Sequence, residues 1–365
     1  MNPIEHFKDL PDPRKDNPNK LYSVDLIIFI TLTAVISGAD SWTEVEEFGW
    51  EKKEWLKKFV AIPEDRIPSH DTIGDFFSRV NAKDFSSCFL SWTSSLTNTL
   101  EDVIVSVDGK TLRSSYDKGV GKRAIHMISA WASSNRLVLA QNKVDDKTNE
   151  ITAIPDLLSL LELKGALVTI DAMGCQKEIA TQVIQQGADY LLSVKGNQGE
   201  LLREIEDCFK YNPAVDIAQT EEKSHGRLEI RTGKVITDLK EIDVKEQWTG
   251  LKTIIQIARV RENLSAKTKT TETMYYISSR QMQAKAALHS VRSHWGIENE
   301  LHYVLDVEFK EDLSRVWKGD ADQNLSIIRR IALNLLKLNK SKGSMNIKRH
   351  RAAWSDSFRE EILKI

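Results

Sequence analysis

The sequence predicts an α/β fold with a helical N-terminal segment and a later β-rich insertion. Apolar residues recur at helical spacing in the first third of the chain, and no run typical of a strand occurs before about residue 103. From 103 to 194, short β-branched and aliphatic runs alternate with helical stretches, which indicates a sheet with at least partly parallel strands. Between 210 and 280 the strand-like runs are no longer separated by long helices, so we expect a β-rich insertion there.

The same periodicities predict where the individual helices and strands lie in the sequence. Helices are expected at 24–37, 42–59, 70–80, 153–163, 176–186, 284–306 and 323–338. Strands are expected at 103–108, 126–133, 137–144, 167–171, 190–194, 228–236, 251–260 and 270–278. Gly38 and Pro63 interrupt the first helical runs, and Ser69 is a candidate cap for the helix that begins near 70.

Composition excludes several classes of protein. The 365 residues contain 41% hydrophobic and 28% charged residues with only 8 Pro, which is typical of a globular protein rather than a disordered one. The longest apolar stretch, 26–36, is shorter than the roughly 20 residues of a membrane-spanning helix. We see no secretory signal and therefore expect a cytoplasmic protein. The 3 cysteines form no C-x-x-C motif, so no zinc framework is expected.

Charge gives no general sign of a polyanion partner. Lys plus Arg number 51 against 53 Asp plus Glu, a formal net charge of −2, so any such partner has to be held by local basic patches. A modest basic cluster lies near the end of the sequence, between residues 337 and 351. Its members are Lys337, Lys340, Lys342, Lys348, Arg349 and Arg351. It is either a solvated terminal surface or a contact for a polyanion backbone, and the sequence leaves both open.

Common catalytic motifs are absent from the sequence. Gly109-Lys110-Thr111 resembles the end of a P-loop, but Ile104 stands where that motif needs glycine. Neither H-E-x-x-H nor G-x-S-x-G occurs. Nucleotide hydrolase, zinc protease and α/β-hydrolase functions therefore lose their simplest support.

Two aspartates stand where predicted strands end. Asp108 closes the run VIVSVD, and Asp171 closes LVTID. Ligands bind at the carboxyl ends of strands in open α/β sheets, so a carboxylate there is expected at a cleft. The alternative is that either aspartate only caps a turn or a helix.

A third acid is expected inside the apolar arc of the helix at 284–306. Helical geometry directs Glu298 into this arc and Glu300 away from it, with His294 and His302 four residues before and after Glu298. An inward carboxylate needs a cation or a hydrogen-bonding partner. The alternatives are a structural network with the two histidines or a transition-metal site that uses them.

Together, the three acids favour a hard oxygen site. Asp108, Asp171 and Glu298, without cysteine ligands, suit Mg²⁺ or Mn²⁺. Two such ions can act on the attacking and leaving oxygens of a phosphoryl transfer. Without metal, the clustered carboxylates repel one another and at least one pKa rises.

The motifs around these acids resemble the H-repeat-associated group of bacterial insertion-sequence DDE transposases. The resemblance is carried by VDGK, IDAMGCQ, SVKGNQ, HGRLEIR at 225–231, HWGIEN followed by LHYVLDVEFKED, and the N-terminal FKDLPDPR and LTAVISGADSWTEVEEF. It implies a helical associated domain over 1–97, an RNase H-like DDE catalytic domain over 98–340 and a basic C-terminal tail over 341–365. One departure is that Val291, His294 and Leu305 stand where many related enzymes carry Tyr, Arg and Lys.

The resemblance also implies a chemistry. Asp108 would bridge two Mg²⁺ or Mn²⁺ ions, with Asp171 and Glu298 completing one site each, for cleavage of double-stranded DNA and strand transfer by a 3′-hydroxyl. The chain would act as a homo-oligomer on paired element ends. Residues in or beside the motifs that could contact phosphate are Lys110, Arg113, Lys195, Arg227, Arg231 and Arg292, although for each of them alone an ordinary surface charge is the more common role. The alternatives are a catalytically silent remnant that only binds DNA and a nuclease that stops after hydrolysis.

Overall fold

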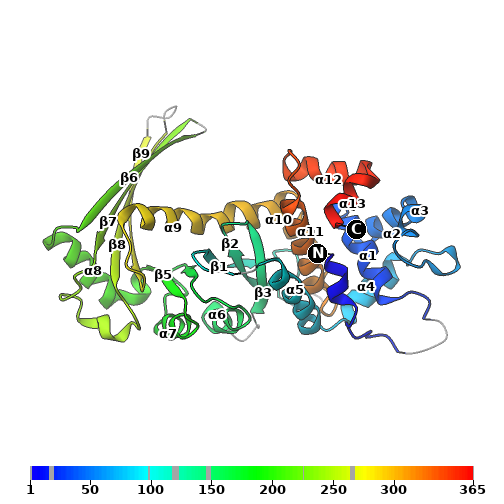
Figure 1. The fold of residues 1–365 in the computed structure, drawn as a ribbon, viewed down its shortest axis with the longest axis horizontal. Helices are drawn as coiled ribbons and strands as arrows, with labels where there is room; N and C mark the ends of the chain where they lie inside the picture. The colour runs from blue at the N-terminus through cyan, green and yellow to red at the C-terminus, as the bar shows by residue number, and fades with distance from the viewer. Residues whose placement is uncertain are drawn as a thin grey trace.

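The fold is known from a computed structural model that describes residues 2–15, 20–97, 99–116, 123–144, 149–224, 226–263 and 268–364 (Figure 1). It is a mixed α/β structure with a large central sheet. His225, the first residue of the HGRLEIR motif, lies outside the described residues.

The first part of the chain is built from helices. These are α1 (Val24–Ile36), α2 (Trp42–Glu51), α3 (Lys53–Leu56), α4 (His70–Arg79) and α5 (Ala82–Leu96). Side-chain oxygens of Ser23, Ser41, Ser69 and Asn81 accept hydrogen bonds from the first free N–H groups of α1, α2, α4 and α5, which explains why these helices begin where they do. All residues of α1 from Leu26 to Ile36 are buried, so this helix forms the centre of the helical body.

The two ends of the chain share this helical body. The last helices are α11 (Ala321–Leu338), α12 (Met345–Trp354) and α13 (Asp356–Leu363). Their buried side chains join those of α1 to α5 in one hydrophobic core. Figure 1 shows α11 beside α1, with α12 and α13 packed next to it.

The basic cluster near the end of the chain fits neither alternative as a whole, because three of its cations donate hydrogen bonds to carbonyl oxygens within the protein. The Lys348 ammonium donates to the carbonyl oxygens of Leu336 (3.0 Å) and Asn339 (2.6 Å). The Arg349 guanidinium donates to the Val35 carbonyl at 3.1 Å. Lys337 donates to the Glu300 carbonyl at 2.9 Å. Only exposed members such as Lys340 and Lys342 fit the solvated surface that the composition suggested.

Nine strands form one sheet in the described residues, in the order β3-β2-β1-β4-β5-β9-β8-β7-β6. The strands are β1 (Ile104–Thr111), β2 (His126–Ala132), β3 (Leu137–Val144), β4 (Leu167–Ile170), β5 (Asp189–Val194), β6 (Asp216–Ser224), β7 (Arg227–Ile236), β8 (Thr253–Asn263) and β9 (Thr268–Ser278). β1, β4 and β5 are parallel neighbours, and β2 and β3 extend the sheet as antiparallel strands.

The β-rich segment after residue 210 continues the central sheet, because β9 pairs antiparallel with β5. Its first strand, β6, was not expected from the sequence. β6 reads DIAQTEEKS, and nearly all of its residues are exposed, so it lacks the apolar alternation by which strands are recognised. Backbone pairing with β7 makes it a strand.

Helices cover both faces of the sheet (Figure 1). α6 (Glu150–Ser159), α7 (Lys177–Gln185) and α8 (Gly199–Tyr211) enclose one apolar core. α9 (Ala284–Gly296) packs on the opposite face, and it continues through a π-helical segment (Ile297–His302) into α10 (Tyr303–Val307). None of the helices in the described parts of the chain combines the length and apolarity that crossing a bilayer requires.

Edge strand β3 is capped by a side chain of α11. The buried Asn334 amide donates to the Val138 carbonyl and accepts from the Val138 N–H, both at 2.9 Å. Asn334 therefore satisfies the backbone groups that an edge strand would otherwise leave unpaired.

We expect Asn334→Ala to lower the free energy of unfolding by about 2–4 kcal/mol, because it leaves a buried N–H and a buried C=O of Val138 unpaired. Urea denaturation followed by circular dichroism measures the change. The exposed Asn346 of α12 provides the control, and Asn346→Ala should change stability by less than about 0.5 kcal/mol. Equal effects of the two variants would contradict the proposed cap.

Candidate active site

Asp108 and Asp171 lie beside each other on neighbouring parallel strands. Asp171 follows the last residue of β4, but Asp108 does not close its strand as the sequence predicted, because pairing with β2 continues β1 to Thr111. The last residues paired between β1 and β4 are Val107 and Ile170, and Asp108 and Asp171 follow them directly. Neighbouring strands are about 4.8 Å apart. The register therefore brings the two aspartates together where the pairing of β1 with β4 ends, and Asp108 is the first residue of β1 beyond that pairing.

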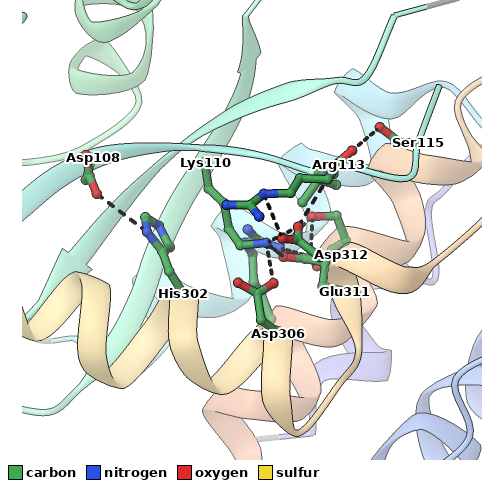
Figure 2. Close-up of polar contacts among 11 residues, drawn as sticks. Asp108, Lys110, Arg113, Ser115, His302, Asp306, Glu311 and Asp312 are labelled. Carbon is green, nitrogen blue, oxygen red and sulfur yellow. Dashed lines mark hydrogen bonds and ion pairs between the residues drawn. The ribbon is translucent and has the colours of Figure 1, made fainter.

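The side chain of Asp108 faces the helix that carries Glu298. Val105 and Val107 lie in the core under α6 and α7, so the alternate residues of β1 face α9 and α10. Asp108 Oδ2 lies 3.5 Å from the Nδ1 atom of His302, which the close-up in Figure 2 shows. On β4, Thr169 Oγ1 is 2.9 Å from Nδ1 of His294 and hydrogen-bonds to Ser106.

Glu298 is exposed at the start of the π-helical segment, rather than buried in the apolar arc. Its two neighbouring histidines contact the strands instead: His294 contacts Thr169 and His302 contacts Asp108. One alternative from the sequence, a structural network of Glu298 with both histidines, is therefore not formed among the described residues. The physical reason is the π-helical turn, since the residue period of an α-helix does not hold across it.

The acids act on one another electrostatically. Burial and the negative charges of Asp171, Glu298 and Glu150 together raise the pKa of Asp108 to about 7, against the opposing effect of the Gly109 N–H. Burial lowers the pKa of His294 to about 4 and that of His302 to about 3. Both imidazoles are consequently neutral at pH 7 and do not balance the carboxylates.

This donor set suits a divalent cation by its chemistry. Carboxylates that repel one another are stabilised by a hard cation between them, and their oxygens are the ligands that Mg²⁺ and Mn²⁺ prefer. In the part of the chain that the structure describes, no three His, Cys, Asp or Glu side chains are gathered closely enough to hold one ion. Asp171 Oδ1 instead accepts the N–H groups of Met173 (3.1 Å) and Gly174 (3.4 Å), the turn-capping role considered from the sequence.

Glu150 is an acid near this site that sequence reasoning missed. It is the first residue of α6, and its Oε1 atom is 2.5 Å from Nε2 of His126 on β2. A Cβ atom at Gly109 would collide with both side chains, so glycine after Asp108 allows Glu150 to approach the strand. Gly109 is the only sign of this contact in the sequence. Glu150 itself gives no signal, because β2 and β3 separate it from Asp108 in the chain and it belongs to a different helix, α6.

Lys110 differs from the expected phosphate contact. Its side chain is 8% exposed, and its ammonium lies 2.6 Å from Asp306, 2.9 Å from Asp312 and 3.4 Å from Glu311 (Figure 2). Three carboxylates thus surround this cation within the protein. The sequence could not show this, because the three acids follow Lys110 by about two hundred residues.

The partners of Lys110 form a buried ion cluster, which we define as Lys110, Asp306, Glu311, Asp312 and Arg330. Arg330 of α11 pairs with Glu311 at 2.8 Å, and the side chains of both residues are 0% exposed. Burial alone would raise the pKa of Glu311, but Arg330 and Lys110 hold it at about 2. Glu311 therefore remains charged and connects β1 to α11.

The other expected phosphate contacts divide into two groups. Arg113 is exposed beside Asp312, at 3.4 Å, and Lys195 is exposed in the loop after β5. That loop adjoins the loop after Asp171, because the Asn197 amide donates to the Ala172 carbonyl at 2.7 Å. Both cations therefore lie on segments that border the acids.

The second group, Arg227, Arg231 and Arg292, lines a groove of about 830 Å³ between α9 and strands β6 to β8. Arg227 and Arg292 are exposed, whereas Arg231 is 12% exposed and pairs with Glu222 and Glu229. The basic residues expected near the acids are thus split between the end of the sheet and this groove.

Comparisons with known proteins agree with these features. The model of the family described as "Transposase DDE domain" matches residues 99–335, and that of "DDE_Tnp_1-associated" matches residues 4–93. "Putative transposase YncI" of Escherichia coli O157:H7 is 42% identical over 99% of this chain and 94% of its own length. "H repeat-associated putative transposase YhhI" of Escherichia coli strain K12 is 39% identical over 99% of this chain and 97% of its own.

Asp108→Asn should stabilise the metal-free protein at pH 8. The folded-state pKa of Asp108 is about 7 against an ordinary 3.8, so the folded form binds this proton more tightly and loses stability as pH rises from about 4 to 7. Asparagine removes that loss, and we expect a gain of about 2 kcal/mol at pH 8 that disappears near pH 4. Urea denaturation in EDTA across this range measures it. Asp207→Asn, at an exposed position of α8, should give no such pH-dependent difference.

Removing the cation of the buried ion cluster should be costly. Lys110→Met leaves Asp306, Glu311 and Asp312 without this partner, and we expect a loss of about 3 kcal/mol in the free energy of unfolding. Lys240→Met is the control, because the Lys240 side chain is 84% exposed in its surface ion pair and should contribute less than about 1 kcal/mol. A stability of Lys110→Met equal to that of the control would contradict the structural role of Lys110.

Proposed function

Because this chain belongs to the Transposase DDE domain family, in its H-repeat-associated group, we propose that it is an insertion-sequence transposase that cuts DNA and transfers the 3′-hydroxyl end. The observation that supports this most is the neighbouring position of Asp108 and Asp171 where the pairing of β1 with β4 ends, on the face covered by the helix of Glu298. We assign these three acids as the catalytic residues.

The sheet supports an RNase H-like catalytic unit. It has an antiparallel β1–β2–β3 meander with β4 and β5 parallel to β1. The proposed acids would then lie in the carboxyl-terminal half of β1 and directly after β4, toward the side of a parallel sheet at which ligands bind. In this proposal β6 to β9 are the insertion that precedes the helix of Glu298, and the helices before β1 are the associated domain.

The chemistry proposed for the site needs divalent metal. Two Mg²⁺ or Mn²⁺ ions held by Asp108, Asp171 and Glu298 would supply an activated water or hydroxyl and stabilise charge at the phosphorus. Asp108, whose pKa is raised by the charges of both other acids, would contact both ions. Neutral His302, beside Asp108, adds no charge to the site and can donate or accept a hydrogen bond there.

DNA would be held by local basic segments, since the net charge of the chain is −2. Arg113 and Lys195 border the acids, and Arg227, Arg231 and Arg292 lie in the arginine-lined groove. Contacts from cations to phosphates weaken with salt. We therefore propose double-stranded DNA as the partner and a homo-oligomer as the active form on two element ends.

The decisive experiment is cleavage and strand transfer on DNA with element ends in Mg²⁺. Asp108→Asn, Asp171→Asn and Glu298→Gln should each lower both reactions by about 100-fold or more, because each keeps side-chain shape but removes a metal ligand. Glu300→Gln, two residues away on the same segment, should keep its activity.

The assay also separates the alternatives. Cleavage without joining of a 3′-hydroxyl donor would indicate a nuclease, and binding without cleavage would indicate a silent remnant. Loss of activity in Glu300→Gln with full activity in Glu298→Gln would show that the third acid is wrongly assigned.

A further inference from the structure

The π-helical segment that carries Glu298 packs on a buried aromatic ring. Ile297 and Leu301 of this segment lie in the same apolar core as Trp131 of β2. At Gly296, directly before the segment, a Cβ atom would lie 3.6 Å from Nε1 of Trp131. The Trp131 side chain is 1% exposed, so the ring is enclosed between the sheet and this part of the helix.

A lysine of α11 contacts the same ring. Lys337 is the last residue but one of α11, and its side chain is 11% exposed. Its ammonium lies 4.1 Å from the centroid of the Trp131 ring. A cation is attracted to the face of an aromatic ring, and the attraction is stronger where water is excluded. The ring therefore places the ammonium next to the π-helical segment.

The Lys337 ammonium also donates to the backbone of this segment. It donates to the carbonyl oxygen of Glu300 at 2.9 Å, and the Asn299 side-chain amide donates to the carbonyl oxygen of Trp295 at 2.9 Å. A helix that changes between α-helical and π-helical spacing cannot pair every carbonyl with its own N–H groups. Side-chain donors therefore stabilise the turn that carries Glu298.

The buried ammonium is unfavourable for folding, which argues against a role in packing alone. Burial lowers the pKa of Lys337 to about 7; the charge of Glu300 opposes this shift, and that of Arg136 adds to it. The Glu300 carboxylate is 3.9 Å from the ammonium and pairs with Arg136 at 3.1 Å. Because this carboxylate is shared, an apolar side chain of similar length would be less unfavourable in the place of Lys337.

We propose that Lys337 is a positioning residue for Glu298: by holding the Glu300 carbonyl beside the Trp131 ring, it fixes the π-helical turn and the direction of the Glu298 carboxylate. Glu300 is two residues after Glu298, so a shift of its carbonyl passes to Glu298 through rigid peptide planes. The role acts through the Glu300 backbone, which Glu300→Gln leaves unchanged. This inference rests on the proposed function for the chemistry at Glu298 and adds a residue of α11 that orients this acid.

The first test follows the segment itself, without DNA or metal. Hydrogen exchange measured by mass spectrometry should be about tenfold faster over 297–303 in Lys337→Met than in the wild type, with the rest of the chain unchanged. Methionine keeps the length of the side chain but cannot donate to the Glu300 carbonyl. Lys337→Arg keeps a cationic donor and should restore the wild-type exchange.

The control for this test is the same substitution outside the contact. Lys340 is exposed and lies two residues after the end of α11, so Lys340→Met should leave exchange over 297–303 unchanged. Circular dichroism and thermal unfolding show whether each variant is folded. Lys337→Met is expected to fold, because it replaces a buried charge with an apolar group.

The second test measures the consequence at the acids with Mn²⁺ alone. Electron paramagnetic resonance of free Mn²⁺ gives its Kd, which Lys337→Met should raise about tenfold, the effect typical of removing the support of a metal ligand. Lys337→Arg and Lys340→Met should stay within about threefold of the wild type. With DNA in Mg²⁺, Lys337→Met should lower the cleavage rate at saturating DNA about tenfold. Its Kd for DNA should change less than about twofold, because Lys337 is buried.

The outcomes distinguish this inference from the proposed function. Unchanged exchange over 297–303 in Lys337→Met, or an equal rise along the whole chain, would overturn the inference even if the wild type cuts and joins DNA. Faster local exchange with unchanged Mn²⁺ binding, or a Lys337→Arg variant that behaves like Lys337→Met, would overturn it too. Faster local exchange and weaker Mn²⁺ binding in a protein that neither cuts nor joins DNA would support the role of Lys337 and refute the transposase function.

Discussion

The position of the acidic site depends on the buried ion cluster that ties the sheet to the helices. Lys110 is two residues after Asp108 on β1, while Glu311 and Arg330 come from segments that follow Glu298 in the chain. Burying charges is unfavourable unless each meets a counterpart in good geometry. Because Glu311 contacts both cations, β1, the segment after α10 and α11 have to come together in one arrangement. We infer that this requirement fixes the strand of Asp108 relative to the helix of Glu298.

Charge is separated within a molecule that is almost neutral overall. The net charge of −2 conceals an acidic site, where neutral His302 leaves the carboxylate of Asp108 uncompensated, and a groove lined by six arginines. In the proposed function, the first would hold divalent cations and the second would hold DNA phosphates. Such local fields, rather than total charge, decide which ligands a protein binds.

The sequence predicted those features that depend on local pattern. The apolar runs before Asp108 and Asp171 predicted two neighbouring strands correctly, because such runs are a local signal, and their parallel arrangement follows from α/β alternation. The end predicted for the first strand was wrong, because pairing with β2 carries β1 past Asp108 to Thr111. β6 was missed because only its pairing with β7 makes it a strand. Lys110 and Lys348 were assigned to the surface by their charge alone, whereas their burial depends on contacts with segments distant in sequence. A period of 3.6 residues likewise could not anticipate the π-helical turn at Glu298.

One helix connects the two regions on which the function rests. Along α9 and the π-helical segment, His294 and His302 face the strands that carry the acids, while Arg292, Trp295 and Asn299 face the groove. A π-helical turn contains one residue more than an α-helical turn. We infer that this extra residue shifts Glu298 to the boundary between the two faces. Because α9 packs on the sheet through Leu288 and is followed by the segment that closes around Lys110, it is held at both ends. The relative position of the proposed acids and the groove is therefore set by a rigid element rather than by a loop.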